Sequence, residues 1–193
     1  GSSKAWSLTL NRAVPLGLAG LAVAVAGRMG LWNIGAEGQI LAGAMMAAWV
    51  ARIGESWPSP LLITVMLLAA VLGGALLGLG PAVARAQIGV NEIITTLMLN
   101  EVALRMLQWL IHGPWKDPES RGFPLAPILP EGARLPGLFQ QAHWGAVIAL
   151  LVIILFGLVA SGTAWGYELR VAGSSGATAL YAGISLKRKI LTV

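Results

Sequence analysis

The chain has 193 residues, 56% of them hydrophobic and 11% charged, with a mean hydropathy of +0.76; soluble domains carry about 25% charged residues, so the composition indicates a membrane protein. The net charge of +5 does not indicate nucleic-acid binding, because the cations stand at the ends of apolar runs and form no basic stripe. The absence of cysteine excludes disulfides, thiolate metal sites and a thiol nucleophile.

Five apolar segments predict helices. They lie at about residues 14–29, 39–50, 60–83, 92–111 and 144–160. The first two are short, since a span takes roughly 20 residues, and they predict a broken pair. The sequence therefore predicts an all-α polytopic membrane protein with about five transmembrane or half-spanning helices, in which residues 4–193 form one incomplete transmembrane domain.

Two connections differ from these apolar segments. Residues 113–143 are rich in proline and predict a folded loop that could hold a short helix. Residues 163–189 end in the densest cation cluster, Lys187-Arg188-Lys189. The positive-inside rule places this second loop in the cytoplasm, and alternation of the spans then places the proline-rich loop outside.

A polar, glycine-rich run separates the first two segments, with Asn33, Glu37 and Gln39 as its polar side chains. Polar groups at membrane depth are costly unless they face protein or a water-filled path. Gly35 and Gly38 free the backbone from the helix, so the run could line a path as a discontinuous helix does. The alternative is a short interfacial loop in which Glu37 lies near a helix N-terminus, where the helix dipole favours a carboxylate.

The fourth apolar segment opens with two residues typical of a helix start. Asn91 could cap the helix, and Glu92 could lie in its first turn. Thr95 and Asn100 follow as further polar groups.

Four further polar residues of this segment share one helical face: Glu101, Arg105, Gln108 and His112. Glu101 and Arg105 have the i, i+4 spacing of a salt bridge. Because Glu101 lies near the middle of the segment, this face should turn toward protein or water. It is either a structural polar stripe or a surface that contacts substrate.

The cytoplasmic loop contains small residues from Ser175 to Gly183, which predict a short amphipathic helix or a plain surface loop. As a helix, it would offer Ala179, Leu180 and Tyr181 for docking into a groove on a partner. A rival hypothesis starts from Ser175, because residues 173–177 resemble the Gly-x-Ser-Gly signature of rhomboid intramembrane serine proteases. Those proteases need a later histidine as general base, and both histidines of this chain lie upstream.

Soluble-enzyme motifs are lacking. No glycine-rich loop precedes Lys-Ser or Lys-Thr, so the chain is not expected to hydrolyse ATP. No cluster has metal-ligand spacing, and the sequence predicts neither a metal site nor a catalytic residue.

Four stretches, in order, resemble the membrane permease subunits of binding-protein-dependent ABC importers. They are residues 30–39, 89–100, 113–118 and 169–184. The branch is that of the ribose, nucleoside and branched-chain amino-acid permeases, and the first two stretches resemble the nucleoside type most. Two departures are visible: residues 175–178 replace a usual Asn-Pro followed by basic residues, and family members have about twice as many spans.

The resemblance implies an importer subunit in the lipid of a bacterial cytoplasmic (inner) membrane. Its partners would be a second permease subunit, cytoplasmic ATPase subunits that bind the ATP, and an extracytoplasmic solute-binding protein; the chain itself would hold no cofactor. Nucleosides are the expected solute, with ribose-like sugars or branched-chain amino acids as alternatives and the protease using Ser175 as a different class.

Two sets of residues follow from this interpretation. The expected solute-path residues are Asn33, Glu37, Gln39, Asn91, Glu92, Thr95 and Asn100. The residues expected to couple to the ATPase are Glu168, Arg170, Gly173, Ser175, Ala179, Tyr181 and Gly183.

Overall fold

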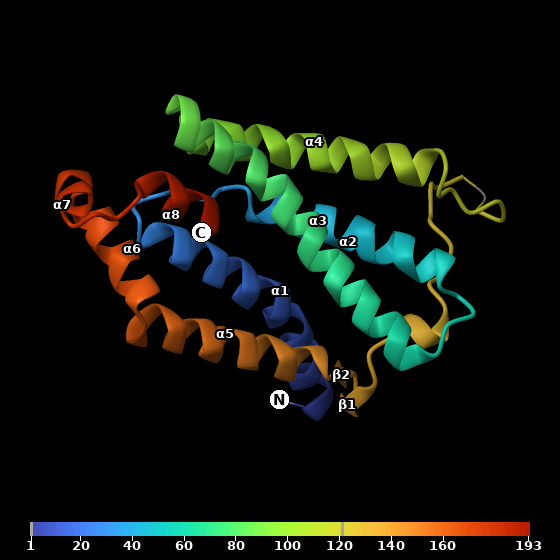
Figure 1. The fold of residues 1–193 in the computed structure, drawn as a ribbon. Helices are drawn as coiled ribbons and strands as arrows, with labels where there is room; N and C mark the ends of the chain where they lie inside the picture. Colours follow the sequence, from blue (N-terminus) through green and yellow to red (C-terminus); the bar gives the residue numbers. More distant parts are fainter. Residues whose placement is uncertain (1, 121) are drawn as a thin grey trace.

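The computed structural model describes residues 2–120 and 122–193, and this part of the chain is built from α-helices with one small hairpin (Figure 1). The elements are α1 Ser3–Gly27, α2 Ala36–Ile53, α3 Ser59–Ile88, α4 Glu92–His112, the 3₁₀ turn η1 Glu131–Ala133, β1 Gly137–Phe139, β2 Ala142–His143, α5 Gly145–Gly162, α6 Ala164–Ser174, α7 Gly176–Tyr181 and α8 Leu186–Thr192. The all-α prediction is confirmed, and α1 to α5 occupy the five predicted segments. The antiparallel pair β1–β2 within the proline-rich loop was not predicted.

Three of the described helices, α1, α3 and α5, are long and apolar enough to cross a membrane. The prediction that the first segment is too short to span is wrong, because α1 begins at Ser3 and has 25 residues. The first turns of α1 contain several polar residues, so an apolar run does not show where this helix begins. Ser2 caps this start by accepting a hydrogen bond from the Ala5 amide, and the Asn11 side chain donates to the Gln141 carbonyl at 2.7 Å.

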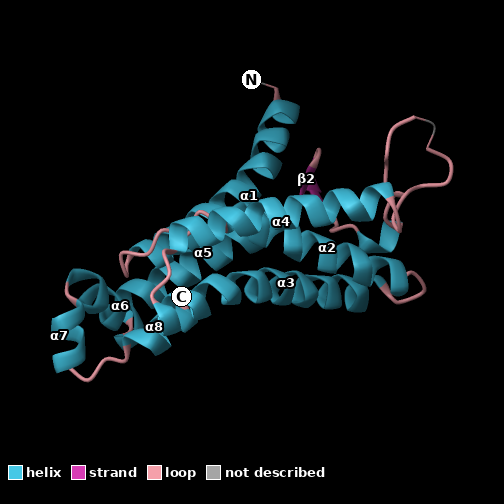
Figure 2. Cartoon of the chain, turned by 90° about the horizontal axis from the view of Figure 1, so that it is seen from above, coloured by secondary structure: helices cyan, strands magenta, loops and turns pink. Residues whose placement is uncertain are grey.

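The helices form two groups, and α6, α7 and α8 join these groups at one end of the molecule. Helices α2, α3 and α4 lie side by side, and α1 packs along α5 (Figures 1 and 2). Helices α6, α7 and α8 gather at the end where α1 and α3 finish, whereas the hairpin lies at the opposite end (Figure 1). An apolar cluster of Val25, Met29 and Leu169 fixes α6 to the end of α1.

Glycines bring α2 and α3 into backbone contact. A Cβ added at Gly43 would lie 2.7 Å from the Ala70 carbonyl oxygen, and one at Gly73 would lie 2.7 Å from that of Ala42. Small residues of this kind let membrane helices approach closely, because dispersion contacts and not hydrophobic burial hold helices together in lipid.

This contact determines where α2 begins relative to the end of α3. Gln39, in the first turn of α2, lies against Gly78, and ten further residues of α3 follow Gly78. At 1.5 Å per residue, α2 therefore begins about 15 Å short of the end of α3. The first turn of α2 therefore lies beside α3 and not beyond its end. That α2 spans only part of the membrane stays a prediction.

Replacement of Gly73 by alanine is expected to destabilise the protein by about 1–3 kcal/mol, because the new methyl group meets the Ala42 backbone. The matched control is Gly157→Ala on α5, where an added Cβ meets nothing within 4 Å. That control should be neutral or gain up to about 1 kcal/mol from helix propensity. Thermal unfolding of the detergent-solubilised variants measures both, and equal midpoints would contradict the close packing of α2 on α3.

Candidate functional site

The candidate site is built on the break between α1 and α2. Gly30 turns the chain with a φ of +70°, a left-handed conformation that favours glycine, and the chain stays non-helical until Ala36. The Asn33 side chain shapes this segment, because its Oδ1 accepts a hydrogen bond from the Gly35 amide at 3.0 Å. The polar run therefore contains a non-helical segment between two helices, which is compatible with both predicted alternatives, a path-lining segment and an interfacial loop.

A single side-chain amide, that of Asn100 on α4, binds both the non-helical segment and the first turn of α2. Asn100 Oδ1 accepts a hydrogen bond from the Gly38 amide, and Asn100 Nδ2 donates one to the Ile34 carbonyl, each at 2.8 Å. The first amides of a helix have no partner within it, and Gly35, at the N-cap, has no side chain to supply one. A neighbouring helix therefore caps α2 through Asn100.

The second glycine of the run has a different role from the one predicted. Gly38 does not interrupt the helix, because it lies within α2. A Cβ at this position would lie 2.7 Å from Asn100 Oδ1 and 3.0 Å from Asn100 Cα. Gly38 therefore permits the close approach of α4, and without it the Asn100 amide could not reach the backbone.

Two more amide side chains lie beside the break. Asn33 Nδ2 and Gln39 Oε1 are 3.4 Å apart, a long hydrogen bond, and both residues are half-buried. Glu37 is exposed in the first turn of α2, where the helix dipole favours its carboxylate. Asn33, Gln39 and Asn100 thus form one group of uncharged polar side chains around the break.

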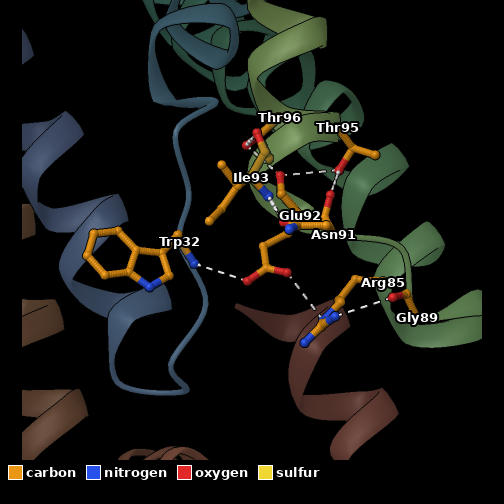
Figure 3. Close-up of polar contacts among 8 residues, drawn as sticks. All are labelled: Trp32, Arg85, Gly89, Asn91, Glu92, Ile93, Thr95 and Thr96. Atoms are coloured by element: carbon orange, nitrogen blue, oxygen red, sulfur yellow. Dashed lines mark hydrogen bonds and ion pairs between the residues drawn. The ribbon is translucent and has the colours of Figure 1, made fainter.

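Glu92 ties the beginning of the non-helical segment to the turn between α3 and α4 (Figure 3). Its Oε1 accepts from the Trp32 amide at 3.4 Å, and its Oε2 lies 3.3 Å from Arg85 Nε. Arg85 Nη1 also donates to the Gly89 carbonyl at 3.3 Å. Neither Trp32 nor Arg85 was among the predicted site residues, and both were missed because they come from different elements.

Two of the predicted path residues are engaged within their own helix. Asn91 caps α4 as predicted, since its Oδ1 accepts from the Ile93 amide at 2.9 Å. The Thr95 hydroxyl lies 3.2 Å from the carbonyls of Asn91 and Glu92 (Figure 3). These groups stabilise the start of α4, and their predicted contact with solute stays a prediction.

Thr96 was not among the predicted path residues, although it lies closer to the break than Thr95. It is 6% exposed, its hydroxyl donates to the Glu92 carbonyl at 2.6 Å, and a Cβ on Gly35 would lie 3.0 Å from Thr96 Cβ. Its spacing in the sequence could have indicated this position, because Glu92, Thr96 and Asn100 recur every fourth residue and so share one face of α4. This row covers about 12 Å of helix axis, along which the non-helical segment runs.

The coupling residues predicted around α6 hold the ends of several helices together. The Arg170 guanidinium donates to the Ala160 carbonyl at 3.0 Å, and Arg28 at the end of α1 donates to the same oxygen. Glu168 forms an ion pair with Lys189 of α8. Gly173 lies against the backbone of Arg28, where any Cβ would overlap the carbonyl oxygen.

The predicted short helix exists as α7, but one of its expected docking residues is not available. Ala179 is fully buried at 0% exposure, so the prediction that it docks a partner is wrong. Tyr181 and Leu180 are 96% and 64% exposed and remain free to dock. Ser175 caps α7 by accepting from the Thr178 amide at 3.2 Å, and Gly183, with a φ of +73°, turns the chain after it.

Neither histidine of the described residues can serve Ser175 as the general base that the protease hypothesis requires. Ser175 lies at the α7 end of the molecule, whereas His143 lies in β2 and His112 ends α4 at the opposite end (Figure 1). A serine nucleophile needs its base within hydrogen-bond reach. Among the described residues, no group of three or more His, Cys, Asp or Glu could hold a metal ion. The arrangement can hydrogen-bond a polar molecule, and it offers no nucleophile–base pair at Ser175.

Comparison with known proteins identifies similar sequences. A family model described as branched-chain amino acid transport system / permease component matches residues 6–193. The glucose ABC transporter permease protein of Haloferax volcanii is 41% identical over 188 residues, which cover 91% of this chain and 49% of that protein. The guanosine ABC transporter permease protein of Bacillus subtilis is 32% identical over 191 residues, covering 95% of this chain and 53% of that protein.

A third relative has a similar coverage. The nucleoside ABC transporter permease protein of Lactococcus lactis is 29% identical over 200 residues, covering 99% of this chain and 55% of that protein. The chain therefore spans about half the length of these curated relatives. No solved structure matches it.

Replacement of Asn100 tests the clamp across the break. Asn100→Leu removes both hydrogen bonds at similar volume and should cost about 1–3 kcal/mol, because the Gly38 amide and the Ile34 carbonyl lose their partner. Asn100→Asp keeps an acceptor for Gly38 and loses the donor to Ile34, so it should be intermediate. Thermal unfolding is the measurement, with the exposed Leu97→Ala on the same helix as control. Equal midpoints for Asn100→Leu and Leu97→Ala would contradict the clamp.

Proposed function

Because the chain belongs to the family of branched-chain amino acid transport system permease components, we propose that it is a permease subunit of an ATP-driven importer for nucleosides. It is a multi-pass protein of the cytoplasmic membrane, in keeping with its family and with its three span-length apolar helices. In this proposal the chain forms part of the solute path, and ATP is bound and hydrolysed by partner subunits.

The observation that carries the proposal is the group of uncharged amides at the break. Asn33, Gln39 and Asn100 offer donors and acceptors beside the break, together with the backbone of the non-helical segment. A desolvated site of this kind pairs the hydroxyl and ring nitrogen groups of a neutral solute and rejects analogues that lack them. Two relatives, a guanosine permease and a nucleoside permease, support the same class of solute.

A sugar is the second candidate, and a specific observation favours it. The relative that is 41% identical is a glucose permease. Sugars and nucleosides share vicinal hydroxyl groups, so the same amides suit both. A branched-chain amino acid is supported by the description of the family alone.

The partners proposed for this chain are a second permease subunit, cytoplasmic ATPase subunits and an extracytoplasmic solute-binding protein. The exposed Tyr181 and Leu180 of α7 offer an apolar surface for the ATPase. Displacement of α7 would reach α6, and Gly173 of α6 lies against the Arg28 backbone just before the break. This contact gives a short mechanical route from the ATPase to the solute path.

Uptake measurements decide among the solutes. Cells that lack the gene for the full-length protein, and the same cells with the gene restored, would be given labelled guanosine, glucose and leucine. Restored uptake of guanosine is the expected result. Uptake of glucose instead would replace the nucleoside proposal with the sugar one, and no restored uptake of any solute would overturn the importer proposal.

Gly173→Ala is expected to reduce uptake at least tenfold, because the added methyl group overlaps the Arg28 carbonyl and displaces α6 from α1. The matched control is Gly20→Ala on α1, where a Cβ meets nothing within 4 Å. Uptake is compared at equal membrane abundance of the two variants, so that loss of folding is not counted as loss of coupling. If the Gly173→Ala variant takes up solute at the wild-type rate, this contact does not belong to the coupling route.

A further inference from the structure

A polar stripe on α4 is uncovered by the rest of the described chain. The stripe consists of Glu101, Arg105, Gln108 and His112, which all lie on the exposed surface. The side chains of Glu101 and Arg105 are 64% and 73% exposed. We infer that this stripe lines the water-filled solute path and hydrogen-bonds the hydroxyl groups of a sugar or nucleoside, an inference that rests on the proposed importer function.

The depth of the stripe makes contact with lipid untenable. Glu101 lies nine residues after Glu92, at the start of α4, which is about 14 Å along the helix axis. Helix α4 lies beside α2 and α3 (Figures 1 and 2), so this point is within the helical layer. Charged side chains at that depth face protein or water.

The types of side chain favour water over a packed helix. Where α4 packs against its neighbours, it uses small residues, the buried Thr96 and Ala103. Interfaces between membrane helices are enriched in such small residues. The stripe instead carries long side chains that hold other helices at a distance, as the wall of a polar passage does.

Both ends of the stripe meet features that a path requires. At its outer end, His112 and Lys116 line a cavity of about 320 Å³ together with Gly122, Phe123 and Pro124. At its inner end, Glu101 directly follows Asn100, whose amide holds the break. The stripe therefore connects the end of α4 predicted to lie outside with the proposed solute-path amides.

The chemistry of the stripe suits a neutral solute. Arg105 Nη2 lies 3.6 Å from Glu101 Oε2, and Arg105 Nη1 donates to Gln108 Oε1 at 3.3 Å. The charges of Glu101 and Arg105 are opposite, so the stripe is close to neutral there. The carboxylate, the guanidinium and the Gln108 amide leave alternating acceptors and donors for a solute. Vicinal hydroxyl groups can bind such a set in two-point fashion, because each hydroxyl both donates and accepts.

Single cysteines test the inference, because the chain has none of its own. Gln108→Cys and Arg105→Cys would be made in the full-length protein, with any cysteine outside residues 1–193 replaced by serine. They would be probed in native membranes with a membrane-impermeant maleimide, applied to both faces. Gln108→Cys leaves the Glu101–Arg105 pair intact, so it guards against loss of folding in the other variant. The matched control is Met106→Cys, a residue 52% exposed at the same depth but off the stripe.

Both stripe cysteines are expected to react at least tenfold faster than Met106→Cys, and saturating guanosine or glucose should slow their labelling at least threefold. Stripe cysteines that react no faster than the control would overturn the inference, since protein or lipid would then cover the stripe. Fast labelling that no transported solute slows would overturn its contact with solute. Failure of the importer proposal is separate, because it appears as absent uptake by the wild-type protein.

Discussion

The structure depends on one constraint: the backbone groups that are left free where α2 begins, beside α3 and α4, need hydrogen-bond partners. The side-chain amide of Asn100 meets this constraint with two hydrogen bonds. It accepts one from the Gly38 amide and donates one to the Ile34 carbonyl. An asparagine suits this role because its side chain donates and accepts at once. An uncharged amide also costs less free energy to bury than a charged side chain would.

Close helix packing is what makes the clamp possible. Gly43 and Gly73 set α2 against α3, and Gly38 sets α2 against α4. Each contact involves backbone, so each holds α2 close to its neighbouring helix. The break is therefore held in place by α2, α3 and α4, and the uncharged amides around it keep a fixed arrangement, as the proposed recognition of a solute requires.

The sequence predicted those parts of the molecule that local interactions decide. Asn91 caps α4 through a residue two positions away, and the five apolar segments became helices, because both depend on neighbours in the chain. The Asn100 contacts join residues more than sixty positions apart, which no local pattern reveals. The burial of Ala179 was mispredicted for the same reason, since α7 alone does not show which of its faces the fold covers.

The same packing links the two ends of the proposed mechanism. Gly173 touches the backbone of Arg28, and the chain reaches Trp32, which is bonded to Glu92, only four residues later. A few residues in a turn cannot absorb a displacement of α6 as a long loop would, so the shift would be passed to the segment that Asn100 clamps. Because Asn100 adjoins the polar stripe of α4, such a shift would alter the amides at the break and the stripe together. Coupling and recognition would then use one set of contacts.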